Sequence, residues 1–192
     1  MEAQRLKKLA NKGLLTAQQL QDFLGVSQPT ISRLVKTGAI QRHGHGLYAH
    51  PKLKIPPDIL DFAIACSKFG PQSAIGGLSA LFHYGLLDQP PSQLWVVVPP
   101  EKSNHNNFYR MIRTKTPPVI EADTLEHYRI TNVERTILEA LKFAPKIGVR
   151  VAINAARDAL KKKLTTEKKL GEVAKRLRLH AILEKYWEMI VL

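Results

Sequence analysis

Polar and cationic side chains gather in residues 27–37, a stretch whose spacing predicts a short helix. A helix advances by about 100° per residue. With Ile31 on its inner face, Pro29, Arg33 and Lys36 point outward, and Gln28, Thr30, Ser32 and Thr37 lie on the flanks. Such side chains are suited to DNA: arginine bonds guanine, glutamine pairs with adenine, and hydroxyls reach phosphates or thymine methyls. Lysine adds salt-dependent attraction to the backbone.

A second group of candidate DNA contacts follows at once. Residues 39–42 and 47–49 are β-prone and flank the loop His43-Gly44-His45-Gly46, which is a hairpin signal. The glycines hold His43 and His45 near Arg42. We predict the following DNA-binding residues from the helix and the hairpin together: Ser27, Gln28, Thr30, Ser32, Arg33, Lys36, Thr37, Arg42, His43 and His45. A small helical domain with a polar outer face could instead bind another protein, and that alternative stays open.

The elements that would position these residues form a winged helix-turn-helix. Thr16 and Gln19 fit a capping box that opens a helix with the apolar stripe Ala17, Leu20, Phe23 and Leu24. Gly25-Val26-Ser27 is a tight turn, and Ser27 is a good N-cap for the next helix, with Pro29 in its first turn. Gly38 is expected to end that helix in a left-handed conformation. In this motif the second helix enters the major groove of duplex DNA.

The charge of the chain agrees with a polyanionic partner. The 192 residues carry 29 Lys and Arg against 16 Asp and Glu, a formal net charge of +13. Residues 1–54 hold nine basic and two acidic side chains, residues 55–141 seven and nine, and residues 142–185 thirteen and four. Both ends are therefore basic. We predict a secondary basic surface that contacts phosphates at Lys161, Lys162, Lys163, Lys168 and Lys169, the alternative being a solvated helix face.

The overall fold class expected is α+β, with the domain boundary at residues 54/55. Residues 1–54 form the winged helix-turn-helix, and residues 55–192 form a larger mixed domain with a small β-sheet and a helical C-terminal half. Helices are expected near 58–69, 73–84, 131–143, 147–162, 166–178 and 180–190. A buried strand is expected at 93–98, with two or three short strands between 108 and 130. Thr131 to Glu134 fits a second capping box.

Enzymatic chemistry is poorly supported. Gly76-Gly77 invites comparison with nucleotidyltransferases, but Asp88 stands alone where Mg²⁺ needs two carboxylates. His83-Tyr84 and the lone Cys66 have ordinary structural interpretations, and His43, His45 and His50 lack a matching set of metal ligands. We expect no catalysis, no cofactor and no metal. The chain carries neither a membrane span nor a secretory signal, so a cytoplasmic location is expected.

Three stretches of the sequence resemble one protein family. Residues 14–51, LLTAQQLQDFLGVSQPTISRLVKTGAIQRHGHGLYAHP, look like the N-terminal winged helix of AbiEi-type antitoxins, transcriptional regulators of bacterial type IV toxin–antitoxin systems. Residues 73–99, SAIGGLSALFHYGLLDQPPSQLWVVVP, look like the opening of the family's antitoxin domain, and residues 130–141, ITNVERTILEAL, are similar to a later helix entry. The resemblance covers nearly the whole chain.

This resemblance implies a function for each segment. The N-terminal domain would bind inverted repeats of double-stranded DNA in its own promoter and repress its operon. The recognition helix would be Gln28–Thr37 and the wing Gln41–Ala49. The C-terminal domain would act as antitoxin against a neighbouring nucleotidyltransferase-like toxin, without a stable complex, and its basic helices from Lys142 to Lys185 would assist DNA binding. Two alternatives stay open: a nuclease or nucleotidyltransferase tethered by the winged helix, and a module that binds the toxin directly.

Overall fold

A computed structural model of the chain describes residues 2–44 and 46–192. The chain divides into two compact units. One extends to Pro71 and includes Glu126–Tyr128, and the other comprises Gln72–Leu125 and Arg129–Leu192.

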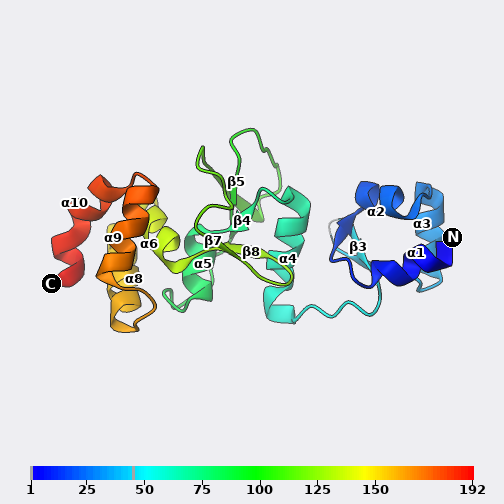
Figure 1. Ribbon diagram of the computed structural model, residues 1–192, viewed down its shortest axis with the longest axis horizontal. Coiled ribbons are helices and arrows are strands. Elements are labelled where there is room, and N and C mark those ends of the chain that lie inside the picture. Colours follow the sequence, from blue (N-terminus) through cyan, green and yellow to red (C-terminus); the bar gives the residue numbers. More distant parts are fainter. Residues whose placement is uncertain (1, 45) are drawn as a thin grey trace. The chain divides into compact units, whose positions relative to one another are not determined.

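The first unit is built from helices and a small antiparallel sheet (Figure 1). Its elements are α1 (Glu2–Leu9), β1 (Leu15–Thr16), α2 (Ala17–Leu24), α3 (Gln28–Lys36), β2 (Gln41–His43), β3 (Leu47–Ala49) and α4 (Pro57–Phe69). The strand order is β1-β3-β2, and both pairings are antiparallel. This is the winged helix-turn-helix predicted from the sequence, with β2 and β3 as the wing.

Apolar side chains from α1, α2, α3 and the wing share one core. Leu9, Leu20, Ile31 and Ile40 are almost completely buried in it. Each such side chain contributes about 1.5–3 kcal/mol when it leaves water, so this core fixes the orientation of α3. A second small cluster joins α4 to the strands of the sheet. The contacts of α4 therefore place it with the first unit, whereas the expected boundary at 54/55 assigned it to the second.

The second unit contains a five-stranded mixed sheet of order β6-β5-β4-β8-β7. Its strands are β4 (Ala74–Ile75), β5 (Leu94–Val98), β6 (Tyr109–Arg113), β7 (Ala122–Thr124) and β8 (Arg129–Thr131). The central strand β4 pairs antiparallel with β5 and parallel with β8, and β6 pairs parallel with β5. Strand β6 thus lies at one edge of the sheet.

Helices make up the rest of the second unit. They are α5 (Gly77–His83), α6 (Val133–Lys142), α7 (Ala144–Ile147), α8 (Val149–Lys161), α9 (Glu167–Arg176) and α10 (His180–Val191). Helices α6, α8, α9 and α10 lie side by side (Figure 1). Their apolar faces form a single core that α5 also joins. The expected α+β class and helical C-terminal half are therefore confirmed.

Two local predictions for the second unit were wrong. The helix expected over 73–84 begins only at Gly77, because Ala74 and Ile75 form the fully buried central strand β4. The capping box expected at 131–134 does not form: Asn132 is the N-cap, and its side chain accepts a hydrogen bond from the Arg135 amide. Glu134 is buried instead. Its carboxylate accepts a hydrogen bond from Thr165, just before α9, and forms an ion pair with Lys169 of α9.

Candidate nucleic-acid interface

The predicted capping box and turn hold α2 and α3 in a fixed relation. The Thr16 hydroxyl accepts from the Gln19 amide at 3.3 Å, and the Gln19 side chain accepts from the Thr16 amide at 2.9 Å. Helix α2 ends at Gly25, which has a φ of 71° and donates its amide to the Gln21 carbonyl at 2.7 Å. From α1, Arg5 Nη1 donates to the Leu24 carbonyl at 2.8 Å. Hydrogen bonds from Gly25 and from Arg5 therefore hold the turn before α3 in place.

Helix α3 has the two faces that the sequence predicted. Ile31 and Leu34 are buried on its inner face. The outer side chains are exposed at Ser27, Gln28, Ser32, Arg33, Lys36 and Thr37, and Thr30 is half-buried. Arg33 and Lys36 therefore project from the unit as two cations one helical turn apart. Gly38 has a φ of 74°, as expected of the residue that follows the helix.

Hydrogen bonds restrict what several of these side chains can offer a ligand. The Ser32 hydroxyl donates to the Gln28 carbonyl at 3.2 Å, and the Thr37 hydroxyl donates to the Leu34 carbonyl at 3.1 Å. Both hydroxyls therefore present lone pairs rather than a proton. Gln21 Nε2 donates to Gln28 Oε1 at 3.3 Å, which orients the Gln28 amide.

In the wing, Arg42 is exposed and His43 is half-buried. The register places Arg42 opposite Tyr48 and His43 opposite Leu47, and both of these partners are buried. Burial lowers the pKa of His43, which favours the neutral imidazole at pH 7. Its Nε2 is buried and has no hydrogen-bond partner among the described residues, so His43 is suited to packing rather than to charge attraction. His45, the other wing histidine predicted to bind DNA, lies outside the described residues.

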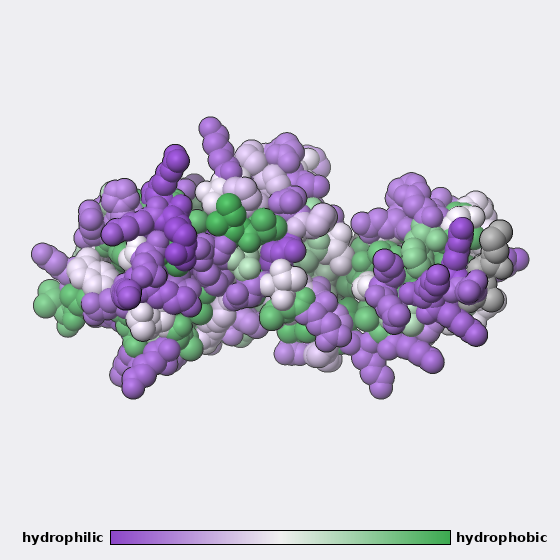
Figure 2. All heavy atoms as spheres, viewed as in Figure 1, coloured by the Kyte–Doolittle hydropathy of each residue, from purple (hydrophilic) through white to green (hydrophobic). Residues whose placement is uncertain are grey.

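The predicted secondary basic surface lies at the end of α8 and the start of α9, and all five lysines are exposed. Two of them already have partners within the unit. Lys162 Nζ donates to the Gly85 carbonyl at 2.6 Å. Lys169 Nζ lies 3.0 Å from Oε1 of the buried Glu134, and this ion pair reduces the charge that Lys169 offers a ligand. Hydrophilic side chains cover most of the face seen in Figure 2.

Close packing explains Gly76 and Gly77, the pair compared with nucleotidyltransferases. A Cβ on Gly76 would lie 2.4 Å from the Val97 side chain, and a Cβ on Gly77 would lie 2.5 Å from the Trp95 ring. The glycines therefore let α5 begin directly against β5. Asp88 is exposed in the segment between α5 and β5.

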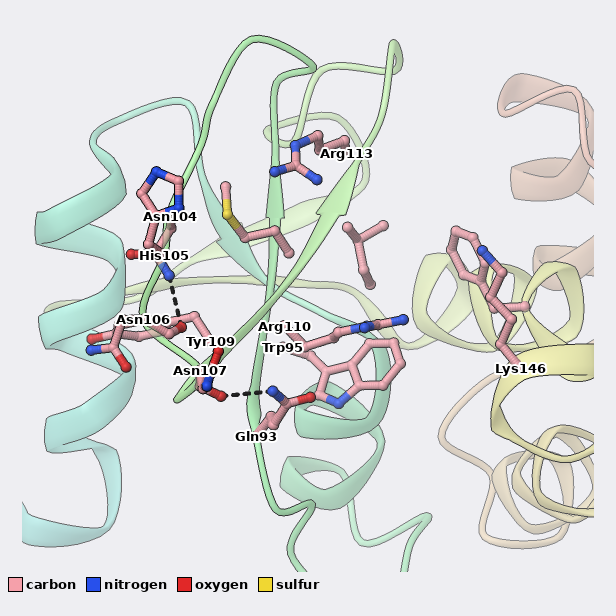
Figure 3. A pocket seen from close by; sticks show the side chains of 13 residues that line it. Gln93, Trp95, Asn104, His105, Asn106, Asn107, Tyr109, Arg110, Arg113 and Lys146 are labelled. Carbon is pink, nitrogen blue, oxygen red and sulfur yellow. Dashed lines mark hydrogen bonds between the residues drawn. The ribbon is translucent and has the colours of Figure 1, made fainter.

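Sequence interpretation missed a pocket in the second unit (Figure 3). Trp95, taken from the sequence as a core residue, is half-buried and lines this pocket. Arg110, Arg113 and Lys146 line it as well. The presence of two exposed cations, Arg110 and Arg113, on one short strand is the one signal that could have marked them, since exposed cations on a strand point to a ligand or solvent.

The exposed polar face of α3, the turn before it and the wing give the first unit the fold of a winged helix-turn-helix domain. Residues 4–51 match the model of a family described as "Transcriptional regulator, AbiEi antitoxin". The match confirms the family resemblance for this segment.

Other comparisons bear on the fold. The crystal structure of the RV2827C protein from Mycobacterium tuberculosis is similar with a TM-score of 0.54 and 15% sequence identity, covering 90% of this chain and 71% of that chain. The likeness covers most of this chain and is a likeness of fold alone. No curated protein matches the chain. In the part of the chain that the structure describes, no helix has the length and apolar character needed to cross a membrane.

Proposed function

We propose that the chain is a sequence-specific DNA-binding repressor that controls its own operon and is the antitoxin of a type IV toxin–antitoxin system. The observation that carries the proposal is the outer face of α3: Arg33 and Lys36 are exposed, while Ile31 and Leu34 anchor the opposite face. The major groove of B-DNA, about 12 Å wide, admits one helix. The match of residues 4–51 to antitoxin regulators supports the same conclusion.

Each side chain on this face has a distinct role in the proposal. Arg33 bonds a guanine edge, and Lys36 neutralises phosphate. Gln28, oriented by Gln21, keeps both hydrogens of its Nε2 and a second lone pair on Oε1 for an adenine edge. Ser27 and Thr30, whose hydroxyls lie 3.3 Å apart at the start of α3, contact the backbone. Arg42 and His43 reach the groove or phosphates beside the helix.

The second unit supplies the antitoxin activity in this proposal. Its functional partner is a nucleotidyltransferase-like toxin encoded beside it, which it counteracts without a stable complex. Lys161, Lys163 and Lys168 extend the contact with DNA phosphates, since these three exposed lysines are close in sequence. Lys162 and Lys169 contribute less, because each bonds within the unit.

Binding of the full-length chain to a labelled duplex from its own upstream region tests the repressor role. We expect tight binding to inverted repeats, a steep fall with salt, and weaker binding to a scrambled duplex. Arg33→Ala/Lys36→Ala should weaken binding at least about tenfold and lower the salt slope by about 1. Arg150→Ala/Lys175→Ala removes the same charge from exposed sites on the basic helices of the second unit, so it should weaken binding less and leave the preference for the operator over the scrambled duplex unchanged. Equal loss in both double variants would refute recognition by α3.

Coexpression tests the antitoxin role separately. We expect the chain to restore growth of cells that express the neighbouring toxin gene, and Arg33→Ala/Lys36→Ala to restore it equally. Recovery of chain and toxin as one stable complex would favour a direct toxin-binding module instead.

A further inference from the structure

The pocket of the second unit has a volume of about 660 Å³, within the range of small-molecule sites. It surrounds the edge strand β6 and includes Trp95 of β5, the loop 104–107, and Phe143 and Lys146 beside α6 and α7. In Figure 3, Arg110 extends from β6 toward the side on which Lys146 lies. All of its lining residues belong to the second unit, so the pocket is separate from the winged helix.

The lining is cationic and aromatic. Arg110, Arg113 and Lys146 contribute positive charge, and among the described residues that line the pocket none is Asp or Glu. The Arg110 guanidinium lies 5.8 Å from the Trp95 ring centroid, and Lys146 Nζ lies 5.9 Å from that of Phe143. Arg110 and Lys146 are therefore each held over an aromatic face, with no carboxylate among the described residues of the lining.

Amide groups line the other side of the pocket and are held in place by the backbone. Gln93 Nε2 donates to the Asn107 carbonyl at 2.6 Å, and Asn104 Nδ2 donates to the Asn106 carbonyl at 2.9 Å (Figure 3). Asn106 Oδ1 accepts from the amide of Phe108 at 2.9 Å. Each side-chain amide keeps its second polar atom, and such donor and acceptor groups match the edge of a nucleobase.

The guanidinium of Arg113 is fixed as well. Its Nε donates to the Lys102 carbonyl at 2.9 Å, which leaves the two Nη groups as donors, on the face of β6 opposite to Arg110. The pocket combines phosphate donors at Arg110 and Lys146 with a stacking surface and base-edge groups.

We propose that this pocket binds one nucleotide unit, with its phosphates at Arg110 and Lys146 and its base against the Trp95–Arg110 pair and the amides of residues 104–107. Guanidinium planes and aromatic rings both stack on bases. The nucleotide is either free or the end of a single strand. The proposal does not depend on operator recognition by the first unit.

Calorimetry on the full-length chain tests the proposal. The probes are ATP, GTP, CTP and UTP without added metal, inorganic pyrophosphate, and a six-nucleotide single strand. We expect saturable binding of a nucleotide or of the strand at one site per chain, with pyrophosphate weaker. Binding of the triphosphates alone identifies the free nucleotide as ligand, and binding only of the strand identifies a strand end.

Two double variants locate the site. Arg110→Ala/Lys146→Ala removes two exposed cations from the pocket lining and should weaken binding at least about tenfold, equivalent to 1.4 kcal/mol. Arg110→Gln/Lys146→Gln serves if the alanine variant unfolds. Arg150→Ala/Lys175→Ala, which removes the same charge elsewhere in the unit, should bind normally. Arg33→Ala/Lys36→Ala should also bind normally, although it fails on operator DNA.

Four results would overturn the proposal. These are undetectable binding at millimolar probe, equal weakening in the Arg150→Ala/Lys175→Ala control, loss of nucleotide binding in Arg33→Ala/Lys36→Ala, and pyrophosphate or an acidic peptide binding as tightly as the nucleotide. Undetectable binding or equal weakening in the control would show that the pocket is not the site. Loss of binding in Arg33→Ala/Lys36→Ala would show that the nucleotide binds the winged helix. Equally tight binding of pyrophosphate or an acidic peptide would show that the base is not recognised.

Discussion

The fully buried side chain of Arg135 offers a sharp test of how the second unit is held together. Its Nε donates to Glu139 Oε1 at 2.8 Å, one turn further along α6. Its Nη1 donates to the carbonyls of Pro117 at 3.1 Å and Pro118 at 3.2 Å, and also to that of Ile120. One guanidinium therefore joins α6 to the segment that leads into β7.

We expect Arg135→Met to lower the free energy of unfolding by about 3–5 kcal/mol. Methionine keeps much of the apolar stem, but it leaves the Glu139 carboxylate, which is 6% exposed, buried without its cation. Three backbone carbonyls also lose their donor. Because small domains are stable by only about 5–15 kcal/mol, the change removes a large part of the stability.

Urea denaturation followed by circular dichroism measures this loss, with the exposed Arg150→Met as control, expected within about 0.5 kcal/mol of the natural chain. Arg135→Met/Glu139→Leu should recover about 1–3 kcal/mol, because neither charge of the pair remains buried. Amide hydrogen exchange in residues 119–122 should be faster in both Arg135 variants. An Arg135→Met chain within about 1 kcal/mol of the natural one would show that the guanidinium does not hold the loop.

The wing and the acidic side of stability give two further predictions. In anisotropy titrations of operator DNA, Arg42→Ala should lower the slope of log K against log salt by about 0.9. His43→Gln should leave this slope unchanged at pH 7, because burial lowers the pKa of His43. A smaller slope for His43→Gln would contradict this reasoning. The hydrogen bond from Arg176 holds the pKa of Glu121 below its usual range near 4.3. The stability that this pair contributes is present above that pH and is lost as pH falls through the folded-state pKa of Glu121. Glu121→Gln should therefore make the urea midpoint depend less on pH between about pH 5 and pH 3.

The first unit was predictable because its signals are local. The capping box of Thr16 and Gln19, the left-handed Gly38 and the buried Ile31 all depend on neighbours within a few residues. The hydrogen bonds of Ser32 and Thr37 to their own helix were not predictable, because the same outward position allows a hydroxyl to bond either solvent or the preceding turn.

Strand β4 shows where local reasoning fails. Ala74 and Ile75 belong to a sequence with helical spacing, yet Ile75 pairs with Val96 on one side and with Ile130 on the other. Those partners lie far along the chain, and their backbone groups decide the conformation of the segment. Glu134 is a similar case, since its partners Thr165 and Lys169 turn an expected cap into a buried contact between helices.

The pocket was missed for the same reason: its residues are distant in sequence and meet only in the folded second unit. Trp95, Arg110 and Lys146 each have an ordinary interpretation in the sequence: a core aromatic, a strand surface and a helix surface. Only the sheet and the α6–α7 corner bring them together. The excess charge of the chain then divides between two separate units, and we expect variants in one unit to remove operator binding or nucleotide binding alone. If both sites act as proposed, a variant that loses one activity and keeps the other assigns any effect on toxin or promoter to its own unit.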